Sequence, residues 1–461
     1  MNDIKLERLK RIVINNESRK SEILKAKCYY GNQTDIQECG VTPKNYDGNE
    51  GKDPLRSADN RLSHNFHQIL VDEKVSYMFT YPIIIDVDNN SDINKKVKSV
   101  LGKDFERKLK NIAIEASNTG VGWMHYWIDK NNDFKYEKVN SEEIIPKYSN
   151  GLEKDLESII RVYSCKEEKE GVVDEELYTY LEYWTDSTID IFKFQGGTCC
   201  GSFLEEKHIK HELGKVPFIE FDNNSIKHSD LSKYKNQIDL YDKVKSGYAN
   251  DLEDIQQIIY ILENYGGADL AEFKKDLKRY KTIKTETDSA GSSGGVKTLQ
   301  IEIPVEARKV ILDILRKEIY EFGQGLQQDV ESVGNASGVA LKFFYRKIEL
   351  KSGLMETEFR SSINKLVEAI LKFLEIKNYN DISQTYTRNM ISNDYENAQI
   401  AQMSIGFISN KTIMKNHPWV EDADLEEEQK KKEYKKKNQD NDDYKDAFPN
   451  KEEENNNDED E

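Results

Sequence analysis

The sequence has few cysteines, and they follow no recognisable pattern. Five occur in 461 residues, and none forms the Cys-x-x-Cys spacing typical of zinc or redox sites. A disulfide framework is typical of short chains with regularly spaced cysteines, so none is predicted. We expect reduced thiols at all five positions, which are Cys28, Cys39, Cys165, Cys199 and Cys200.

Long apolar runs are also lacking. No stretch approaches the roughly 18 consecutive apolar residues of a membrane-spanning helix. Residues 1–20 carry a charged helical pattern in place of the apolar segment of a secretory leader. We therefore expect a protein that neither spans a membrane nor is secreted by that route.

The chain lacks the basic excess of an ordinary nucleic-acid-binding protein. Its 67 Lys and Arg residues are outnumbered by 85 Asp and Glu residues, which gives a net charge of −18. Because proteins that grip phosphates need a positive footprint, any contact with DNA is expected to be weak or transient. Residues 438–461 contain eleven acidic residues and two lysines, so they contribute 2 − 11 = −9. A segment of that composition is predicted to be disordered.

No catalytic motif is recognisable. The sequence contains no Gly-x-Ser-x-Gly elbow, no His-Glu-x-x-His helix and no Walker sequence. Residues 291–298 approximate a phosphate-binding loop, but Val296 replaces the second glycine and a strand pattern follows where a helix should begin. A flexible hairpin loop is therefore favoured there. We predict no catalytic residue, no metal and no cofactor.

Two groups of residues that include histidines are possible metal sites. Four possible zinc ligands lie within thirteen positions, namely Cys199, Cys200, His208 and His211. Adjacent cysteines rarely bind one ion together, so a buried strand end followed by a surface turn is favoured. His64 and His67 lie three residues apart in a helical pattern without a suitably spaced carboxylate. They are predicted to be capping or surface residues.

Helical and strand patterns both occur in the first half of the chain. Apolar spacing predicts helices over residues 5–30, 64–79 and 103–117. Between residues 120 and 221 the pattern changes to short alternating strands, predicted at 123–128, 134–139, 159–163, 177–184 and 189–194. The first half is therefore predicted to be an α+β domain.

The second half is dominated by long helices. Apolar residues three and four apart predict helices over residues 240–262 and 305–322, which flank an insert. Within the insert, strands are predicted at 280–287 and 296–303. The longest helix is predicted over residues 339–376, with Gly353 marking a bend, and an amphipathic section follows at 395–414.

Several segments resemble the phage portal protein family of siphophages that infect Gram-positive bacteria. The most specific matches are Asp-Leu-Tyr-Asp at 239–242 with Asn-Asp-Leu-Glu-Asp at 250–254, and Gly-Asn-Ala-Ser-Gly-Val-Ala-Leu at 334–341. Further matching segments are 29–33, 65–66 with 71–77, 81–83, 120–129, 143–146, 211–218 and 223–224. Thr80 departs from the pattern, because the family commonly has glycine there. The match is weak beyond residue 380.

The resemblance implies an α+β, mainly α, portal fold. This fold has a wing, a two-helix stem, a small α/β clip, a long bent wing helix and a helical crown. The implied boundaries are wing 1–239 with its β-rich segment 120–221, stem helices 240–262 and 305–326, clip 263–304, tunnel loop 327–337, long wing helix 338–379, crown 380–437 and disordered acidic tail 438–461.

The resemblance also implies a function without catalysis. Copies of the chain would form a dodecameric ring at one capsid vertex, through which double-stranded DNA is packaged and ejected without sequence specificity. The implied partners are the terminase large subunit, which hydrolyses ATP, then a head-completion adaptor, and the capsid and scaffold proteins, with no membrane. The expected locations are the virion and, during assembly, the host cytoplasm.

Two sets of site residues follow from the resemblance. The set facing DNA lies in the tunnel loop and comprises Gln328, Asp329, Val330, Glu331, Ser332, Val333, Gly334 and Asn335. The set for clip contacts between subunits and with the motor comprises Tyr280, Ile283, Thr285, Leu299, Ile301 and Ile303. An insert of roughly forty residues buries too little surface to fold alone, so it is expected to pack on a neighbouring subunit.

Two other classes of protein were considered. An oligomeric structural adaptor of a phage-like particle that does not conduct DNA would share the long helices. An enzyme fused to a portal would need additional sequence with its own motif, and none is present.

Overall fold

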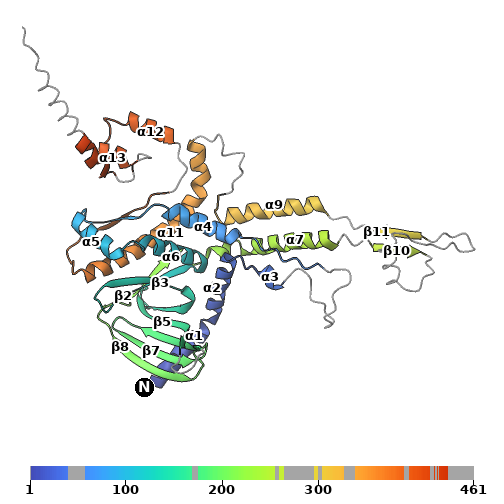
Figure 1. The fold of residues 1–461 in the computed structure, drawn as a ribbon, viewed down its shortest axis with the longest axis horizontal. Helices are drawn as coiled ribbons and strands as arrows, with labels where there is room; N and C mark the ends of the chain where they lie inside the picture. The colour runs from blue at the N-terminus through green and yellow to red at the C-terminus, as the bar shows by residue number, and fades with distance from the viewer. Residues whose placement is uncertain are drawn as a thin grey trace, which may run out of the picture. The chain divides into compact units, whose positions relative to one another are not determined.

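The computed structural model describes residues 2–39, 58–168, 175–254, 259–263, 295–299, 304–326, 338–388, 394–415, 420, 423 and 425–433. The chain divides into two compact units. The first comprises residues 1–327 and 346–389, and the second comprises residues 328–345 and 390–461. The first unit combines helices with antiparallel strands (Figure 1). The predicted α+β class is confirmed.

Two helices occupy the N-terminal segment that was predicted as one helix over residues 5–30. They are α1 (Asn2–Asn15) and α2 (Glu17–Tyr30), which meet at Asn16. The Asn16 side-chain amide donates to a backbone carbonyl one turn earlier, at 2.8 Å. Asparagine side chains compete in this way with the backbone bonds of a helix, which accounts for the break. A short helix, α3 (Asp35–Cys39), follows.

Helices also supply most of the main hydrophobic core. The contributing helices are α4 (Phe66–Phe79), α5 (Ser91–Leu101), α6 (Phe105–Thr119) and α11 (Gly338–Phe373). α11 buries side chains that recur mainly at spacings of three and four residues, namely Met355, Phe359, Ile363, Leu366, Val367, Ile370 and Leu371. One apolar face of this long helix therefore lies within the core. The helix continues without interruption through Gly353.

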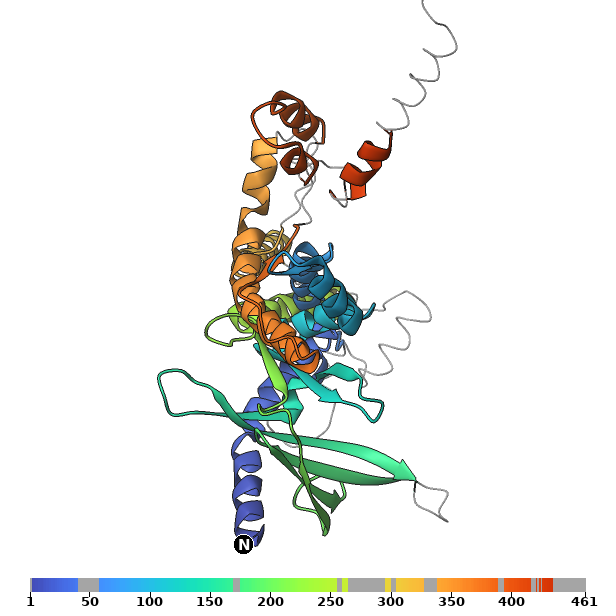
Figure 2. The ribbon, with the colours of Figure 1, turned by 90° about the vertical axis from the view of Figure 1, so that its left-hand side faces the viewer.

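Two antiparallel sheets account for the predicted β-rich segment 120–221. The first has the order β3-β2-β9, with β2 (Val121–Ile128), β3 (Phe134–Val139) and β9 (Phe218–Asp222). The second has the order β4-β5-β6-β7-β8, with β4 (Ile144–Tyr148), β5 (Leu156–Glu168), β6 (Glu175–Trp184), β7 (Thr188–Gln195) and β8 (Phe203–Lys210). Leu9 of α1 packs against the second sheet beside Leu181 and Phe192, and Figure 2 shows α1 running beside its strands.

A small two-stranded sheet joins segments that are far apart in the sequence. β1 (Ile84–Val87) pairs with β12 (Ile382–Thr385), and the register places Ile84 opposite Thr385. The turn after β1 strengthens the pairing, because the Asp88 carboxylate accepts backbone N–H groups of Asn380 at 2.8 Å and Asp381 at 2.9 Å. Neither strand was predicted from the sequence.

Two helices lie side by side in the region predicted as the stem (Figure 1). They are α7 (Lys235–Asp254) and α9 (Val305–Phe322), and α9 has the predicted bounds. The prediction of one helix over residues 240–262 is wrong for residues 259–262, because residues 259–263 form a strand, β10 (Ile259–Glu263). That strand is rich in isoleucine and tyrosine, which favour extended backbone over helix.

The insert between these helices is described in part. β10 pairs antiparallel with β11 (Gly295–Leu299), which begins at the predicted strand 296–303. The predicted strand 280–287 lies outside the described residues.

The described part of the second unit is helical. It contains α12 (Asp394–Met403) and α13 (Asn410–Lys415), which together cover most of the amphipathic section predicted at 395–414. Within the described ranges, no helix has both the length and the apolar character needed to cross a membrane.

Candidate functional site

Three of the four possible zinc ligands make other contacts, and Cys200 is exposed. Nδ1 of His208 lies 2.5 Å from the carboxylate of Asp190, and Nε2 of His211 lies 3.1 Å from the carbonyl oxygen of Thr185. Cys199 is buried against the five-stranded sheet. Among the residues that the structure describes, no group of three or more His, Cys, Asp or Glu side chains is placed to hold a metal ion.

The prediction that His67 caps a helix or lies at the surface is wrong. His67 is buried, and its Nδ1 lies 2.8 Å from the hydroxyl group of Tyr234. Burial lowers the pKa of His67 to about 4, so the ring is neutral near pH 7. His64 is half-buried and bonds the buried carboxylate of Asp242 at 2.8 Å, which is a tertiary contact and not a helix cap.

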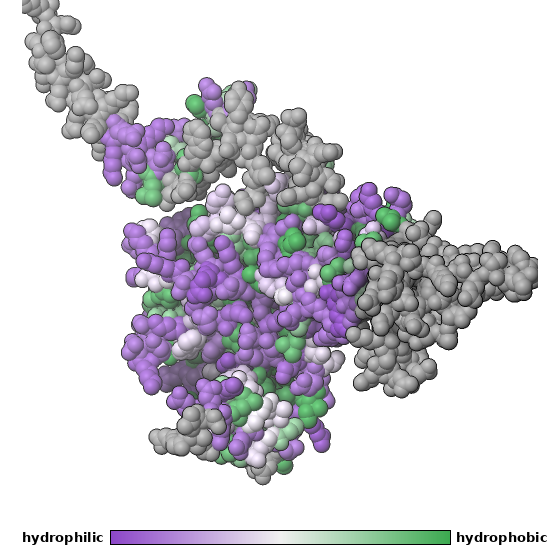
Figure 3. All heavy atoms as spheres, turned by 45° about the vertical axis from the view of Figure 1, so that its right-hand side comes forward, coloured by the Kyte–Doolittle hydropathy of each residue, from purple (hydrophilic) through white to green (hydrophobic). Residues whose placement is uncertain are grey.

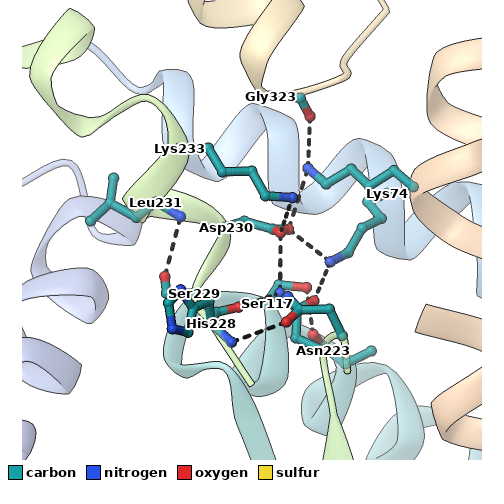
Figure 4. A network of polar contacts seen from close by, with 12 residues as sticks. Lys74, Ser117, Asn223, His228, Ser229, Asp230, Leu231, Lys233 and Gly323 are labelled. Atoms are coloured by element: carbon teal, nitrogen blue, oxygen red, sulfur yellow. Dashed lines mark hydrogen bonds and ion pairs between the residues drawn. The ribbon is translucent and has the colours of Figure 1, made fainter. Parts of the chain in front are cut away.

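The most concentrated buried charge in the described structure lies at Asp230, which is surrounded by two buried lysines and by the exposed Lys233 (Figure 4). Asp230 belongs to the short helix η2 (Asp230–Lys233), and one of its carboxylate oxygens lies 2.7 Å from the ammonium group of Lys74 on α4. The same oxygen lies 3.3 Å from the ammonium group of Lys351 on α11. These three side chains are at most 4% exposed, so solvent does not screen their interaction.

Asn223 completes the pairing of these charges. Its side-chain carbonyl accepts from Lys74 at 2.6 Å, and its amide donates to Asp230 at 3.1 Å. The same amide donates to the carbonyl of His228 at 2.9 Å, which fixes the turn that carries Asp230. The ion pair is therefore supported by neutral hydrogen bonds, as a buried pair requires.

The pKa values show that the ion pair holds its charges. Burial alone would raise the pKa of Asp230, but the surrounding ammonium groups outweigh it and hold this pKa well below its usual range. Burial lowers the pKa of Lys74 to about 8, while Asp230 opposes that change. Burial likewise lowers the pKa of Lys351. The aspartate is thus ionised at neutral pH, and its charge favours the protonated form of both lysines.

These contacts fix the chain immediately before the predicted tunnel loop. We call residues 323–326 the loop root. The ammonium group of Lys351 donates to the carbonyl of Gly323 at 2.8 Å, and the carboxylate of Glu73 accepts the backbone N–H of Leu326 at 3.1 Å. Both contacts come from helices of the core, α4 and α11. The loop root is therefore attached to the interior of the first unit.

The loop root leaves little room for a side chain at its two glycines. A Cβ atom added at Gly325 would lie 2.2 Å from Cδ2 of Leu70, and one added at Gly323 would lie 2.6 Å from Cδ1 of the same residue. Contacts that short force a neighbour to move. The two glycines allow the backbone to lie directly on α4, within reach of Glu73.

Glu73 adds a second carboxylate near the buried lysines. It bonds the loop root through the N–H of Leu326, and the charge of Lys351 influences its pKa. Burial raises the pKa of Glu73, while its bond to the Leu326 N–H and the charge of Lys351 oppose that change. We call Glu73, Lys74, Asn223, Asp230 and Lys351 the anchor network.

The predicted site residues fall mostly outside the described residues. All eight residues of the tunnel-loop set, 328–335, lie outside, as do Tyr280, Ile283, Thr285, Ile301 and Ile303 of the clip set. Leu299 is described as the last residue of β11, where it pairs with Ile259.

Sequence analysis did not identify the anchor network as a site. Residues 71–77 and 223–224 match the portal family without any assigned role, yet Glu73, Lys74 and Asn223 all belong to the network. The available signal was a lysine among apolar positions of a predicted helix. Its partner Asp230 is 156 residues away in the sequence, so the pattern around Lys74 could not reveal the pairing.

The two helices α7 and α9 expose apolar side chains. They are joined by an ion pair between Arg308 and Asp251, and their ends near α4 meet in contacts of Phe66 with Tyr241 and Tyr320. Their apolar side chains that are 43% to 55% exposed are Leu240, Leu252, Val305, Val310, Ile314 and Phe322. The face of the molecule in Figure 3 is otherwise mainly hydrophilic, with hydrophobic side chains in separate patches.

Comparisons with known proteins identify the family. The model of the family described as "Phage portal protein, SPP1 Gp6-like" matches residues 9–442. The portal protein of Clostridium phage phiCD119 is 60% identical over 432 residues, which cover 92% of this chain and 95% of that protein. The portal protein of Bacillus phage SPP1 is 29% identical over 430 residues, which cover 89% and 83%.

A chain of the neck of a native GTA particle, computed with C12 symmetry, aligns with 76% of this chain and 88% of its own length. Its sequence identity is 12% and its TM-score is 0.42. The match of the family model and the 60% identical relative confirm the resemblance found in the sequence. The chain belongs to the phage portal protein family.

Proposed function

We propose that this chain performs the general function of its family, which is to let DNA pass during packaging. Phage portal proteins form oligomeric rings and are virion components at the capsid vertex. We propose a ring of twelve copies whose channel carries double-stranded DNA inward during packaging and outward during ejection. The observation that most supports this proposal is the 60% identity to a portal protein over 92% of the chain.

The exposed apolar side chains of α7 and α9 support contacts between copies. A buried aliphatic or aromatic side chain stabilises an interface by about 1.5–3 kcal/mol relative to exposure in water. A row of such residues on a helix pair, including Leu252, Val310 and Ile314, is unfavourable in an isolated chain. Adjacent copies in a ring would cover them.

The charge of the chain supports a channel with low affinity for DNA. Twelve copies would carry a formal charge of 12 × −18 = −216. A negative wall repels phosphates, so the duplex stays mobile instead of being held by ion pairs. We propose that residues 328–335 of the tunnel loop face the duplex, with Asp329 and Glu331 as the repelling groups. Contacts of this kind carry no sequence information.

The clip is the proposed docking face for the other components. Tyr280, Ile283, Thr285, Leu299, Ile301 and Ile303 are the proposed residues for contacts between subunits and with the motor. The terminase large subunit would dock there during packaging in the host cytoplasm, and a head-completion adaptor would replace it. Capsid and scaffold proteins would surround the ring. The chain itself has no proposed catalytic activity, and ATP hydrolysis is assigned to terminase.

Reversing the charge of the tunnel loop tests the proposal. The variant Asp329→Lys with Glu331→Lys would place 24 lysines around the constriction of a dodecamer, two from each copy. We expect normal rings that package DNA slowly or stall, together with DNA retention that weakens as salt rises. The measurement is the packaging rate of full-length DNA by purified motor and proheads.

A matched control changes the same charge elsewhere in the chain. The variant Asp446→Lys with Glu452→Lys alters the acidic tail by the same amount and is expected to package at the wild-type rate. Wild-type packaging by the tunnel-loop variant, without salt-dependent retention, would show that the loop does not face DNA. An assembled ring without an open channel in electron micrographs would favour the structural adaptor that does not conduct DNA.

A further inference from the structure

The chain passes between its two units at three points. These points follow Gln327, Tyr345 and Asn389. The described residues of the first unit that adjoin them are the loop root, the start of the α11 portion that begins at Arg346, and residues 386–388. These three short stretches are the covalent connections between the units.

Helices α4 and α11 contact the loop root, and α11 also contacts Arg388. At the loop root, the carboxylate of Glu73 on α4 accepts from Leu326, and Lys351 on α11 donates to Gly323. At the other end, the Nε atom of Arg388 lies 3.2 Å from a carboxylate oxygen of Glu349, and its Nη2 atom donates to Glu356. Both glutamates belong to α11.

Tyr77 connects the second group of contacts to α4. Its buried side chain donates from the hydroxyl group to Glu349 at 2.5 Å. Tyr77 lies one turn after Glu73 on α4, so the two side chains are on the same helix face. Glu349 lies two residues before Lys351 on α11. Hydrogen bonds therefore connect Arg388 to the loop root by way of two short helical segments, residues 349–351 of α11 and residues 73–77 of α4.

We propose that Glu73, Tyr77, Glu349 and Lys351 form a brace that couples the loop root to residues 386–388, which lead into the second unit. A change in the position of Arg388 then changes the freedom of the loop root. The brace is a positioning device, and only its consequence for packaging rests on the proposed role of the tunnel loop. An α-helical turn is stiff, and the ion pair of Arg388 with Glu356, each 14% exposed, is costly to break by removing one partner. These properties favour transmission over local absorption of the change.

Hydrogen exchange in the assembled protein tests the brace. Arg388→Ala removes the contacts with Glu349 and Glu356 and should increase amide exchange at residues 386–388. If the brace couples the two ends, exchange at residues 323–326 should rise as well, by about tenfold, which is within the range of couplings seen between residues of one network. Arg388→Lys keeps one charge and should restore part of the protection.

Arg360→Ala is the matched control. Arg360 also lies on α11, bonds Glu356 through its guanidinium group, and donates to the carbonyl of Gln384 at 2.6 Å. Its removal loosens the neighbouring strand β12 without removing a contact of Glu349. We expect increased exchange at residues 382–385 and wild-type exchange at the loop root.

Two further variants keep the test decisive if Arg388→Ala does not assemble. Tyr77→Phe removes only the hydroxyl group that bonds Glu349, and Tyr163→Phe removes a hydroxyl group that bonds Glu182 in the five-stranded sheet. Only the first should increase exchange at the loop root. The proposal is overturned if the loop root keeps wild-type exchange while residues 386–388 lose protection. It is also overturned if the effects of Glu73→Leu and Arg388→Ala on exchange at the loop root are strictly additive in the double variant.

The packaging assay separates this inference from the proposed function. If Arg388→Ala increases exchange at the loop root but the charge-reversed loop packages DNA at the wild-type rate, the brace is supported and the role of the tunnel loop is contradicted. If Arg388→Ala leaves exchange at the loop root unchanged but the charge-reversed loop slows packaging, the brace is contradicted and the role of the tunnel loop is supported.

Discussion

Replacing Asp230 by asparagine tests the anchor network most directly. The variant keeps the size of the side chain and removes its charge, which leaves the ammonium groups of Lys74 and Lys351 without the carboxylate between them. These lysine side chains are 1% and 4% exposed, so water cannot take its place. Removing one partner of a buried ion pair costs about 3–5 kcal/mol. We expect Asp230→Asn to lower the free energy of unfolding of the first unit by that amount.

The pH dependence of this loss has a definite sign. In the wild-type protein burial lowers the pKa of Lys74 to about 8, and the attraction of Asp230 keeps it from falling further. In the variant the folded pKa drops below 8, while the unfolded pKa stays near 10.4. The part of the loss that comes from Lys74 is complete below the variant's folded pKa and disappears above about pH 8. The variant should therefore be closer to wild type at pH 9 than at pH 6.

Urea denaturation followed by circular dichroism at these two pH values measures both effects. Glu157→Gln is the control, because it removes an exposed carboxylate that pairs with the exposed Lys147 and should cost at most about 1 kcal/mol. The reasoning is refuted if Asp230→Asn costs no more than this control at pH 6, or if its loss does not shrink at pH 9.

Three further predictions follow from other parts of the chain. Burial lowers the pKa of His125 to about 4, so the folded state should lose stability as pH falls from about 6.5 to 4. In urea titrations, His125→Phe should remove about 3 kcal/mol of this loss. An unchanged pH profile would show that His125 is not its cause. Gly325→Ala should cost about 1–3 kcal/mol through its contact with Leu70. An equal cost in a Leu70→Ala background, measured by urea denaturation, would show that this contact is not the cause. Truncation after Lys437 should leave ring formation intact, because the acidic tail cannot offset the entropy of its own ordering; mass photometry would reveal any loss of rings.

Secondary structure was predictable where local pattern and tertiary environment agree. The bounds of α9 follow from its apolar spacing and from Pro304, which precedes the first turn. The predicted helix over residues 240–262 is wrong at residues 259–262, because spacings of three and four do not distinguish a continuing helix from a short strand such as β10. Strands β1 and β12 were missed, because four residues give too short a pattern without their partner.

The anchor network could not be predicted from the local sequence pattern. Lys74, Asp230 and Lys351 occur in a chain with many charged residues, and nothing in their neighbours in sequence marks them as buried. His67 was predicted to be a capping or surface residue because no carboxylate lies at a suitable spacing, but its buried partner is Tyr234, 167 residues away. The family resemblance identified segments of the network, and only the tertiary structure shows what those segments do.

The pairing of β1 with β12 constrains how the chain folds during synthesis. The paired residues are separated by roughly 300 positions, and a ribosome that adds about 5–20 residues per second needs about 15–60 s to produce that length. The helices that precede β2 and the two larger sheets can form early, but the core remains open until α11 and β12 leave the ribosome. Nascent chains are therefore unable to complete the first unit, and so to enter a ring, until most of the polypeptide has been made. Contacts of such long range also make folding slow.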